Sequence, residues 1–309
     1  MNPLLEKIRN RASVLLPKII ELRRHLHANP ELSFEEFNTS AFIASVLKEN
    51  GIQFQDGIVK TGIVAAISGK TSTEKTIALR ADIDALPIEE KNNTEYISKN
   101  KGIMHACGHD VHTASLLGTA IILNELKNEW NGSVKLIFQP GEEKLPGGAS
   151  LMIKEGVLKD PVPEAIMAQH VFPSLEAGKV GFRSGMYMAS TDEIYLTIKG
   201  KGGHAAMPLE YNNPIFIAAS VLQELNRQFM DENSVLREER IREIPTVLAF
   251  GKFIGNGATN VVPDEVKIEG TFRTMNEKWR MEAHELIRKI AEKKAKELGG
   301  ECVITILNG

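Results

Sequence analysis

The stretch "TIALRADID" (residues 76–84) decides the fold, because an apolar run typical of a buried strand ends in Asp82 and Asp84. A helical segment, "VHTASLLGTAIILNELKNEW" (residues 111–130), follows it, and "SVKLIFQPGEE" (residues 133–143) is then a second strand of the same kind. Strands that alternate with helices in this way are characteristic of layered α/β domains. The sequence therefore predicts an α/β layered domain with a mainly parallel sheet.

Side chains that can bind metal or transfer protons follow three of the predicted strands. Asp82 and Asp84 follow "TIAL", Glu142 and Glu143 follow "VKLIF", and His170 follows "IMAQ". The carboxyl ends of parallel strands meet at one edge of an open α/β sheet, and ligands bind at that edge. We therefore expect these groups to form a single site.

The segment "MHACGHDVH" (residues 104–112) adds a thiol and imidazoles to this site. Cys107 and His109 are ligand types that zinc-like ions prefer, and Gly108 between them lets the backbone bring both to one point. A small buried apolar role is the alternative for a lone cysteine, but the neighbours of Cys107 favour metal binding. Together with the carboxylates, these donors exceed what one tetrahedral ion needs. The sequence thus predicts two metal ions about 3.5–4 Å apart, with Cys107 as the best candidate for a bridging ligand.

The adjacent Glu142 and Glu143 predict a division of roles. On a turn after a strand, one carboxylate can bind metal while the other faces the water that attacks the substrate. A carboxylate in that second position can accept the proton of the water and pass it to a leaving amine. The alternative, a solvated acidic pair in a loop, is disfavoured by the histidine and aspartates expected beside it.

From about residue 190 the pattern changes to that of a second, smaller domain. Strands and helices follow in the order β-α-β-β-α-β, which is typical of a ferredoxin-like unit with its helices on one face of a four-stranded sheet. The segments that carry this order are residues 192–200, 213–230, 246–254, 265–273, 276–298 and 301–307. We expect the domains to span residues 1–188 and 189–309. His204, in the glycine-rich "KGKGGHAAMP", would act in catalysis only if this domain closed over the metal centre.

The composition disfavours several classes of partner. A net charge of −3 gives no electrostatic footprint for nucleic acid or an anionic membrane surface. The N-terminal "MNPLLEKIRNRASVLLPKIIELRRHLH" reads as an amphipathic helix interrupted by charges, unlike a signal peptide or a membrane span. Two cysteines far apart in the sequence, Cys107 and Cys302, are poor grounds for a disulfide. We therefore expect a cytoplasmic protein without nucleic-acid or membrane partners.

Several ordered motifs resemble one family over essentially the whole chain. They are "RRHLHANPELSFEE", "LRADIDALPI", "MHACGHDVH", "FQPGEE", "AQHV", "GKGGHAAMP", "TNVVPDEV" and "GTFRT". The chain resembles the dinuclear metallohydrolases of the aminoacylase and carboxypeptidase type. The likeness is closest to the amidohydrolase branch that contains hippurate hydrolases, N-acyl-amino-acid deacetylases and auxin-conjugate hydrolases. The cysteine in "ACGHD" is specific to this branch.

The resemblance implies a role for each residue that matches the family pattern around the metals. Two divalent ions, manganese or zinc with cobalt or nickel also possible, would be bound by Cys107, His109, Glu143 and His170. Glu142 would be the general base. The acyl group and the amino acid of the substrate are left open.

The resemblance also implies roles for residues outside the ligand set. Asp84 would be an orienting acidic residue beside the site. His204 would reach the active site of a partner subunit and polarise the scissile carbonyl, which implies a homodimer formed through the lid domain. Asn260 and Arg273 match lid positions associated with holding the substrate, Arg273 through the substrate carboxylate.

The activity implied by the resemblance is hydrolysis of the amide bond of N-acyl amino acids, by metal-activated hydroxide with Glu142 as base. Family members continue beyond the last lid strand and supply one more metal-binding histidine, whereas this sequence stops at "ITILNG". We therefore expect either a fragment of a longer protein or a shortened relative with impaired chemistry. Two further alternatives stay open: a catalytically silent dimerising or peptide-binding homologue, and a dipeptidase.

Overall fold

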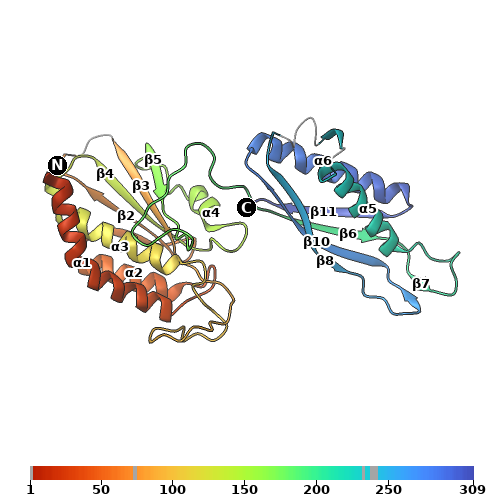
Figure 1. Cartoon of the computed structure of the whole chain (residues 1–309), viewed down its shortest axis with the longest axis horizontal. Helices are drawn as coiled ribbons and strands as arrows, with labels where there is room; N and C mark the ends of the chain where they lie inside the picture. The colour runs from red at the N-terminus through yellow and green to blue at the C-terminus, as the bar shows by residue number, and fades with distance from the viewer. Residues whose placement is uncertain (1–2, 72–74, 232–233, 237–242) are drawn as a thin grey trace. The chain divides into compact units, whose positions relative to one another are not determined.

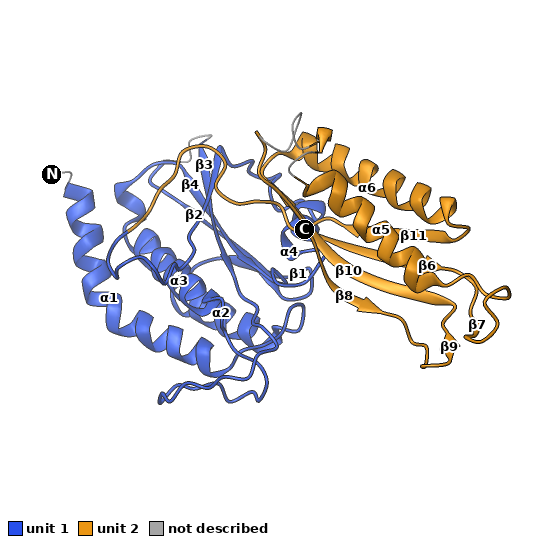
Figure 2. Cartoon of the chain, turned by 45° about the vertical axis from the view of Figure 1, so that its right-hand side comes forward, with its two compact units in different colours: residues 1–179 blue, residues 180–309 orange. Residues whose placement is uncertain are grey.

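The computed structural model describes residues 3–71, 75–231, 234–236 and 243–309. The chain divides into two compact units, residues 1–179 and 180–309 (Figure 2). The sequence pattern predicts the boundary between 188 and 189. Residues 180–189 are exposed and contain no helix or strand. The sequence pattern of the second unit therefore begins only near β6 (Asp192–Lys199), which explains why the predicted boundary lies later than that of the structure.

The first unit is a five-stranded sheet with helices on both faces (Figure 1). The order of its strands is β1-β2-β4-β3-β5. Its elements are α1 (Pro3–Ala28), α2 (Phe37–Glu49), β1 (Phe54–Ile58), β2 (Gly62–Ser68), β3 (Thr76–Asp82), α3 (His109–Glu125), the 3-10 helix η1 (Lys127–Glu129), β4 (Ser133–Gln139), α4 (Gly148–Lys154) and β5 (Ala165–Ala168).

The apolar residues of β4 show how the two faces of this sheet are covered. Leu136 and Phe138 are fully buried in the main core, to which α1, α2 and α3 contribute. Ile137, between them, points to the other face and packs with Met152 of α4 in a smaller core. Successive side chains of a strand alternate between faces, so a strand buried on both sides reads as a continuous apolar run. The α/β layered fold predicted from such runs is confirmed.

The direction of the strands differs from the prediction, because the sheet is mixed rather than mainly parallel. β3 is parallel to both β4 and β5, but β2 is antiparallel to β1 and to β4. Three residues, 59–61, join β1 to β2, and so short a connection permits an antiparallel pair alone. The prediction included no strand at 54–58, so this hairpin was missed.

The parallel part of the sheet positions the residues that were predicted to form the site. In the register of β3 and β4, Asp82 lies opposite Gln139, and in that of β3 and β5, Arg80 lies opposite Ala168. The three strands therefore end at the same edge. Asp84 lies in the segment after β3, Glu142 and Glu143 follow β4, and His170 follows β5.

The second unit is an antiparallel four-stranded sheet in the order β11-β6-β10-β8, covered on one face by two helices (Figure 1). The predicted β-α-β-β-α-β order is present, and a two-stranded ribbon of β7 and β9 is added to it. The elements are β6 (Asp192–Lys199), β7 (Gly203–His204), α5 (Pro214–Phe229), β8 (Thr246–Ile254), β9 (Val261–Val262), β10 (Glu265–Thr274), α6 (Glu277–Glu297) and β11 (Glu301–Leu307).

The helices of the second unit begin at capping asparagines. The Asn213 side chain accepts a hydrogen bond from the N–H of Ile215, and that of Asn276 accepts one from the N–H of Trp279, both at 2.9 Å. Such caps satisfy backbone donors that have no partner within the helix. The two helices then bury their apolar faces against the sheet in a core that includes Ile194, Leu196, Ile198, Phe229, Phe272 and Trp279.

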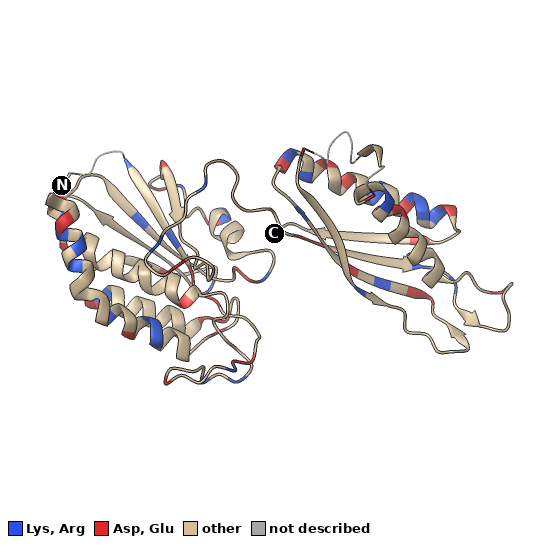
Figure 3. Ribbon diagram, viewed as in Figure 1, with Lys and Arg blue, Asp and Glu red and all other residues tan. Residues whose placement is uncertain are grey.

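Surface charges of both signs are interspersed along α1 and α6 (Figure 3). Lys7 of α1 pairs with Glu129 of η1, and Arg11 of α1 pairs with Glu125 at the end of α3, each at 2.6 Å. Exposed pairs of this kind contribute little to stability. Within the described residues, no helix combines the length and the apolar character needed to cross a membrane.

A buried charge cluster ties α6 to the start of β6. The carboxylate of Asp192 is fully buried, and Nε of Arg280 donates to both of its oxygens at 3.0 Å. Nε2 of His284 lies 2.7 Å from the same carboxylate. Burial raises the pKa of Asp192, but the hydrogen bonds from His284 and Arg280 outweigh it and hold the pKa below its ordinary value.

Replacing Asp192 by alanine is expected to lower the free energy of unfolding of the second unit by about 3–5 kcal/mol, because Arg280 would be left buried without its carboxylate. Urea denaturation followed by the fluorescence of Trp279, in a Trp130→Phe background, measures the change. A carboxylate with a lowered folded pKa stabilises above its unfolded pKa of about 3.9. The difference from wild type should therefore shrink as the pH falls below about 4.

Glu301→Gln serves as the control for this substitution. The Lys199–Glu301 pair spans 3.6 Å in the same sheet, but both side chains are exposed. Its loss is expected to change the free energy of unfolding by less than about 1 kcal/mol. Equal effects of the two substitutions would contradict the structural role assigned to Asp192.

Candidate metal centre

Asp84 is the central acceptor of hydrogen bonds near the edge of the parallel strands. It is fully buried, and its Oδ2 accepts from the Ser33 hydroxyl at 2.6 Å and from the Glu143 N–H at 2.9 Å. Nδ1 of His109 lies 2.9 Å from the Asp84 carbonyl oxygen and 3.2 Å from its Oδ1. Burial raises the pKa of Asp84, but these hydrogen bonds, that of His109 first, hold it below its ordinary value. Nδ1 of His109 therefore carries the hydrogen, which leaves the lone pair of Nε2 available to a metal ion.

The backbone before α3 places His109 at the first position of the helix. Gly108 precedes it with φ at +89°, a left-handed conformation that glycine adopts without steric cost. A Cβ atom at this position would overlap Cγ2 of Val171. Glycine is thus required both by the turn and by the close approach of the chain after β5.

The surroundings of Nε2 of His109 fit a metal ion. This nitrogen is buried, and it has no hydrogen-bond partner among the described residues. Acidic oxygens of Asp82, Glu143 and Glu142 lie 3.7, 3.7 and 3.9 Å from it. Burial alone lowers the pKa of His109, but the hydrogen bond with Asp84, the nearby Cys107 thiol and the charges of Asp82 and Asp84 raise it to about 11. These surroundings favour positive charge at this nitrogen, which a divalent ion would supply.

Cys107 and His170 lie next to one another and close to His109. Sγ of Cys107 is 3.4 Å from Nε2 of His170, while Nδ1 of His170 lies 2.7 Å from the carbonyl oxygen of Val171. The carbonyl can only accept, so Nδ1 carries the hydrogen and Nε2 is available to a metal. Cys107, His109 and His170 each offer a ligand atom within 4.8 Å of the other two.

A second group of possible ligands shares His109 with the first. Glu142 and Glu143 offer carboxylate oxygens that lie within 4.8 Å of each other and of its imidazole. The structure therefore brings together all the residues predicted as metal ligands, which are Cys107, His109, Glu143 and His170. Two overlapping groups of thiolate, imidazole and carboxylate donors exceed the four positions of one tetrahedral ion and suit two divalent ions.

Asp82 and His112 form a supporting layer beneath these donors. Nδ1 of His112 lies 2.6 Å from Oδ1 of Asp82, and Nη1 of Arg80 lies 2.8 Å from Oδ2. The N–H of Val171 donates to Nε2 of His112 at 3.0 Å, so both of its nitrogens are engaged. Burial raises the pKa of Asp82, but the hydrogen bond from His112 and the Arg80 guanidinium lower it to about 2. Asp82 was predicted to lie at the site from its position at the end of β3, but this supporting role was not predicted.

Glu142 lies at the open side of the cluster. Its side chain is 41% exposed, against 22% for Glu143 and 1% for His109. Partial burial raises the pKa of Glu142, and the charge of Glu143 raises it further. A carboxylate that is reachable from solvent and has a raised pKa is suited to exchange protons with water or substrate.

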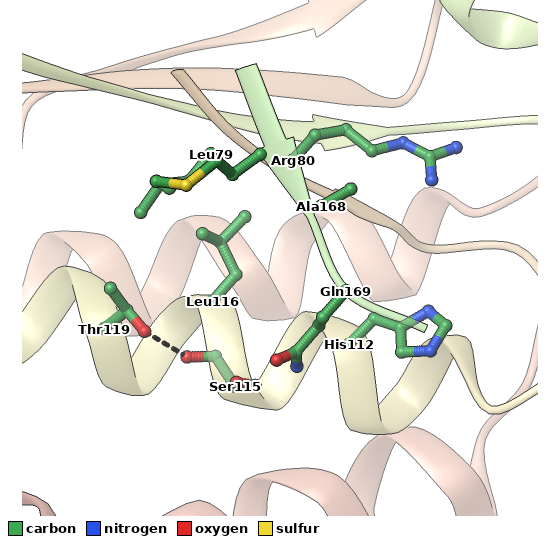
Figure 4. Close-up of a pocket in the computed structure, with 9 residues that line it drawn as sticks. Leu79, Arg80, His112, Ser115, Leu116, Thr119, Ala168 and Gln169 are labelled. Atoms are coloured by element: carbon green, nitrogen blue, oxygen red, sulfur yellow. Dashed lines mark hydrogen bonds between the residues drawn. The ribbon is translucent and has the colours of Figure 1, made fainter. Parts of the chain in front are cut away.

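A cavity of about 160 Å³ opens between α3, β3 and β5, beside the cluster (Figure 4). His112 and Gln169 lie at one end of it, and Ser115 and Thr119 of α3 line its floor. None of the predicted metal ligands is among its lining residues. A substrate that reacts at the candidate metal centre would therefore lie outside this cavity.

The three site residues predicted in the second unit do not lie together. His204 is in β7 and is paired with Val261 of β9, and the carbonyl oxygen of Asn260 accepts a hydrogen bond from the N–H of Ala205 at 3.0 Å. Arg273 is near the opposite end of β10. At about 3.4 Å per residue, the strand places about 27 Å between these two ends. Within one chain, His204 and Asn260 are thus neighbours, while Arg273 is remote from both.

Residues 78–309 match the family described as peptidase family M20/M25/M40. The chain belongs to this family. Among the curated relatives of the chain, the N-acetyl-L-cysteine deacetylase of Bacillus subtilis (strain 168) is 44% identical over 280 residues, which cover 91% of this chain and 65% of that protein. The N-acyl-L-amino acid amidohydrolase of Geobacillus stearothermophilus is 39% identical over 290 residues, covering 93% of this chain and 75% of that protein.

A solved structure from the family supports the metal assignment. A dinuclear metal-binding peptidase of the M20 family from Bacillus subtilis has a TM-score of 0.77 and 36% identity, covering 96% of this chain and 74% of that one. The resemblance inferred from the motifs is thus confirmed. The chain spans about two thirds of the length of the curated relatives, 65% of the deacetylase.

Replacing Cys107 by alanine is expected to abolish the sulfur-to-metal charge-transfer absorption of the cobalt-loaded protein. Loss of a supporting residue weakens metal binding by about 10–100-fold, so loss of a direct ligand should weaken it by at least that factor. Absorption during titration with Co²⁺ measures both effects. The matched control is Cys302→Ala, because Cys302 is the other cysteine of the chain and is buried in the second unit. A charge-transfer band that persisted in Cys107→Ala would contradict the assignment.

Proposed function

We propose that this protein is a metal-dependent amidohydrolase that releases amino acids from N-acyl amino acids. The observation that carries the proposal is the position of Glu142 at the open side of a cluster whose other donors suit two divalent ions. The names of two similar proteins, an N-acetyl-L-cysteine deacetylase and an N-acyl-L-amino acid amidohydrolase, support the substrate class. Manganese or zinc is proposed as the metal, with cobalt or nickel as further options. A cytoplasmic location and the absence of nucleic-acid or membrane partners stay predictions.

The proposed reaction divides its tasks between the metal ligands and the free carboxylate. Two ions, held by Cys107, His109, Glu143 and His170, would act as Lewis acids toward the substrate carbonyl and make water a stronger nucleophile near neutral pH. Glu142 accepts the proton of the attacking water as the new C–O bond forms. It then donates this proton to the leaving nitrogen as the C–N bond breaks, which yields a carboxylic acid and an amino acid.

Asp84 is proposed to orient the reacting groups without touching substrate. It holds Nδ1 of His109 and the backbone N–H of Glu143 at the same time, and so fixes one imidazole and one carboxylate ligand. Ligands that are oriented by hydrogen bonds of this kind lose less freedom when a metal binds.

We further propose that the site is completed by a second copy of the chain. His204 and Asn260 lie at one end of the second unit and Arg273 at the other, so one chain does not present all three to one substrate. A homodimer formed through the second unit would allow one subunit to supply His204 and Asn260 and the other to supply Arg273. In this arrangement His204 would polarise the scissile carbonyl, and Arg273 would bind the substrate carboxylate.

Glu142→Gln is expected to lower the rate of amino acid release by about 10²–10⁴-fold, because an amide cannot accept the proton of water. The assay is release of free amino acid from a panel of N-acetyl and N-benzoyl amino acids, with the protein loaded with Mn²⁺ or Zn²⁺. The bound metal, measured by elemental analysis, should be unchanged in Glu142→Gln and reduced in Glu143→Gln.

Two results would overturn the proposed function. Wild-type turnover in Glu142→Gln would exclude this residue as the base. Folded, metal-loaded wild-type protein that releases no amino acid from any substrate of the panel would favour the silent homologue instead.

Mixing two inactive variants is expected to restore activity if the site is shared between subunits. A dimer of His204→Ala with Glu142→Gln contains one site with both an intact Glu142 and an intact His204. Random pairing should therefore restore about a quarter of the wild-type rate. Mixing Arg273→Ala with Glu142→Gln is the control. In the proposed arrangement Arg273 and Glu142 of one site come from the same chain, so neither site of that dimer would have both residues intact. Equal rates from the two mixtures would contradict the shared site.

A further inference from the structure

We propose that Phe34 and Glu36 are positioning residues that hold the acidic turn, defined here as Gly141–Glu143, in the conformation that presents Glu142 to the metal cluster. The proposal rests on the proposed function, because it concerns the placement of the general base. Both residues belong to the segment between α1 and α2, which supplies neither a metal ligand nor a proton acceptor to the proposed reaction. The sequence places them in the motif "ELSFEE".

Glu36 holds the first residue of the acidic turn. Its side chain is fully buried, and Oε1 accepts a hydrogen bond from the N–H of Gly141 at 2.8 Å. Oε2 accepts a second hydrogen bond from the hydroxyl of Thr61, between β1 and β2, at 2.6 Å. One carboxylate therefore joins three segments that are remote in sequence. A buried carboxyl group is unfavourable unless it is hydrogen-bonded, so its two partners are needed to keep it there.

Phe34 holds the same turn from the side. Gly141 has φ at +56°, and a Cβ atom built on it would overlap the ring of Phe34. The ring thus lies directly against the backbone of the turn. Phe34 itself has φ at +66°, a left-handed conformation that is unfavourable for a bulky residue. Strained backbone of this kind persists where the surrounding structure fixes it, and it is concentrated at functional sites.

The far end of the acidic turn is held by the same segment through Asp84. Ser33 donates to Oδ2 of Asp84, and that oxygen also accepts the N–H of Glu143. The backbone groups before and after Glu142 are therefore both fixed by contacts that lead back to residues 33–36. Fixing the backbone on both sides limits the directions in which the side chain of Glu142 can point. A displacement of about 1 Å at a reacting group can cost about 100-fold in rate.

The first test compares two glycine substitutions in one loop. Gly141→Ala and Gly147→Ala both place a side chain at positive φ, +56° and +77°, but nothing lies within 4 Å of a Cβ at 147. Gly141→Ala alone collides with Phe34. If the contact positions the turn, kcat should fall about 100-fold in Gly141→Ala, with KM changed much less, and by less than about threefold in Gly147→Ala.

The second test compares Glu36→Ala with Glu36→Gln. The glutamine amide oxygen can still accept from Gly141, and its NH₂ group can donate to the Thr61 hydroxyl, so the conservative variant should recover most of the activity that alanine loses. The visible absorption of cobalt-loaded protein is recorded for all four variants. It should change in Gly141→Ala and Glu36→Ala, because the carboxylate of Glu143 moves with the turn, and remain that of wild type in the other two.

The outcomes separate this proposal from the proposed function. If wild-type protein hydrolyses the substrates but Gly141→Ala and Gly147→Ala lose equal activity, the positioning role is overturned and the function stands. If wild-type protein hydrolyses none of the substrates, the proposed function fails and the positioning role is judged from the cobalt spectra alone. Spectra of Gly141→Ala and Glu36→Ala that match wild type overturn the positioning role. Altered spectra in these two variants support it. Thermal unfolding of each variant confirms that spectra are compared on folded protein.

Discussion

The site depends on the hydrogen bonds that converge on the buried carboxylate of Asp84. A hydroxyl from the segment after α1, an imidazole from the start of α3 and a backbone N–H after β4 all donate to this one residue. A buried carboxylate without such donors would be strongly unfavourable, whereas with them it stays charged and holds each donor in place. The proposed metal ligands are therefore oriented only when these three segments have reached their positions in the fold. The formation of the site and that of the first unit are consequently linked.

The sequence predicts that these side chains lie together because buried parallel strands are recognisable as apolar runs. The apolar runs ending at Asp82 and Phe138 identify strands, and their carboxyl ends must meet at one edge once the strands are parallel. The same reasoning fails for residues 54–58, "FQDGI", where exposed polar positions and a glycine give no apolar run. The antiparallel hairpin, and with it the mixed character of the sheet, was missed for this reason. Nor does any local pattern in "ELSFEE" indicate that Ser33 bonds to Asp84, 51 positions away, or that Glu36 bonds to Gly141, 105 positions away.

Left-handed backbone recurs around the candidate metal centre for a physical reason. Gly108 turns the chain into α3, Gly141 opens the acidic turn, and Phe34 lies against Gly141 with φ also positive. At Gly108 and Gly141 an added Cβ would overlap a neighbouring side chain, so the chain segments approach more closely than ordinary residues permit. This close approach brings possible metal ligands from the end of β3 and from the segments before α3, after β4 and after β5 near the imidazole of His109. The backbone near the ligands is thus specified by packing as much as by the ligands themselves.

Two of the buried histidine–carboxylate clusters among the described residues, that at Asp192 and that at the candidate metal centre, differ in how completely their charges are matched. At Asp192, one carboxylate is balanced by the Arg280 guanidinium and accepts from His284, so no further partner is needed. At the candidate metal centre, the carboxylates of two aspartates and two glutamates surround His109, and Arg80 is the guanidinium paired within that group. Excess negative charge around a buried nitrogen without a hydrogen-bond partner is unfavourable for the protein alone. Divalent cations would correct both defects at once, and that imbalance, rather than the presence of histidine and acid as such, distinguishes the candidate metal centre from the cluster at Asp192.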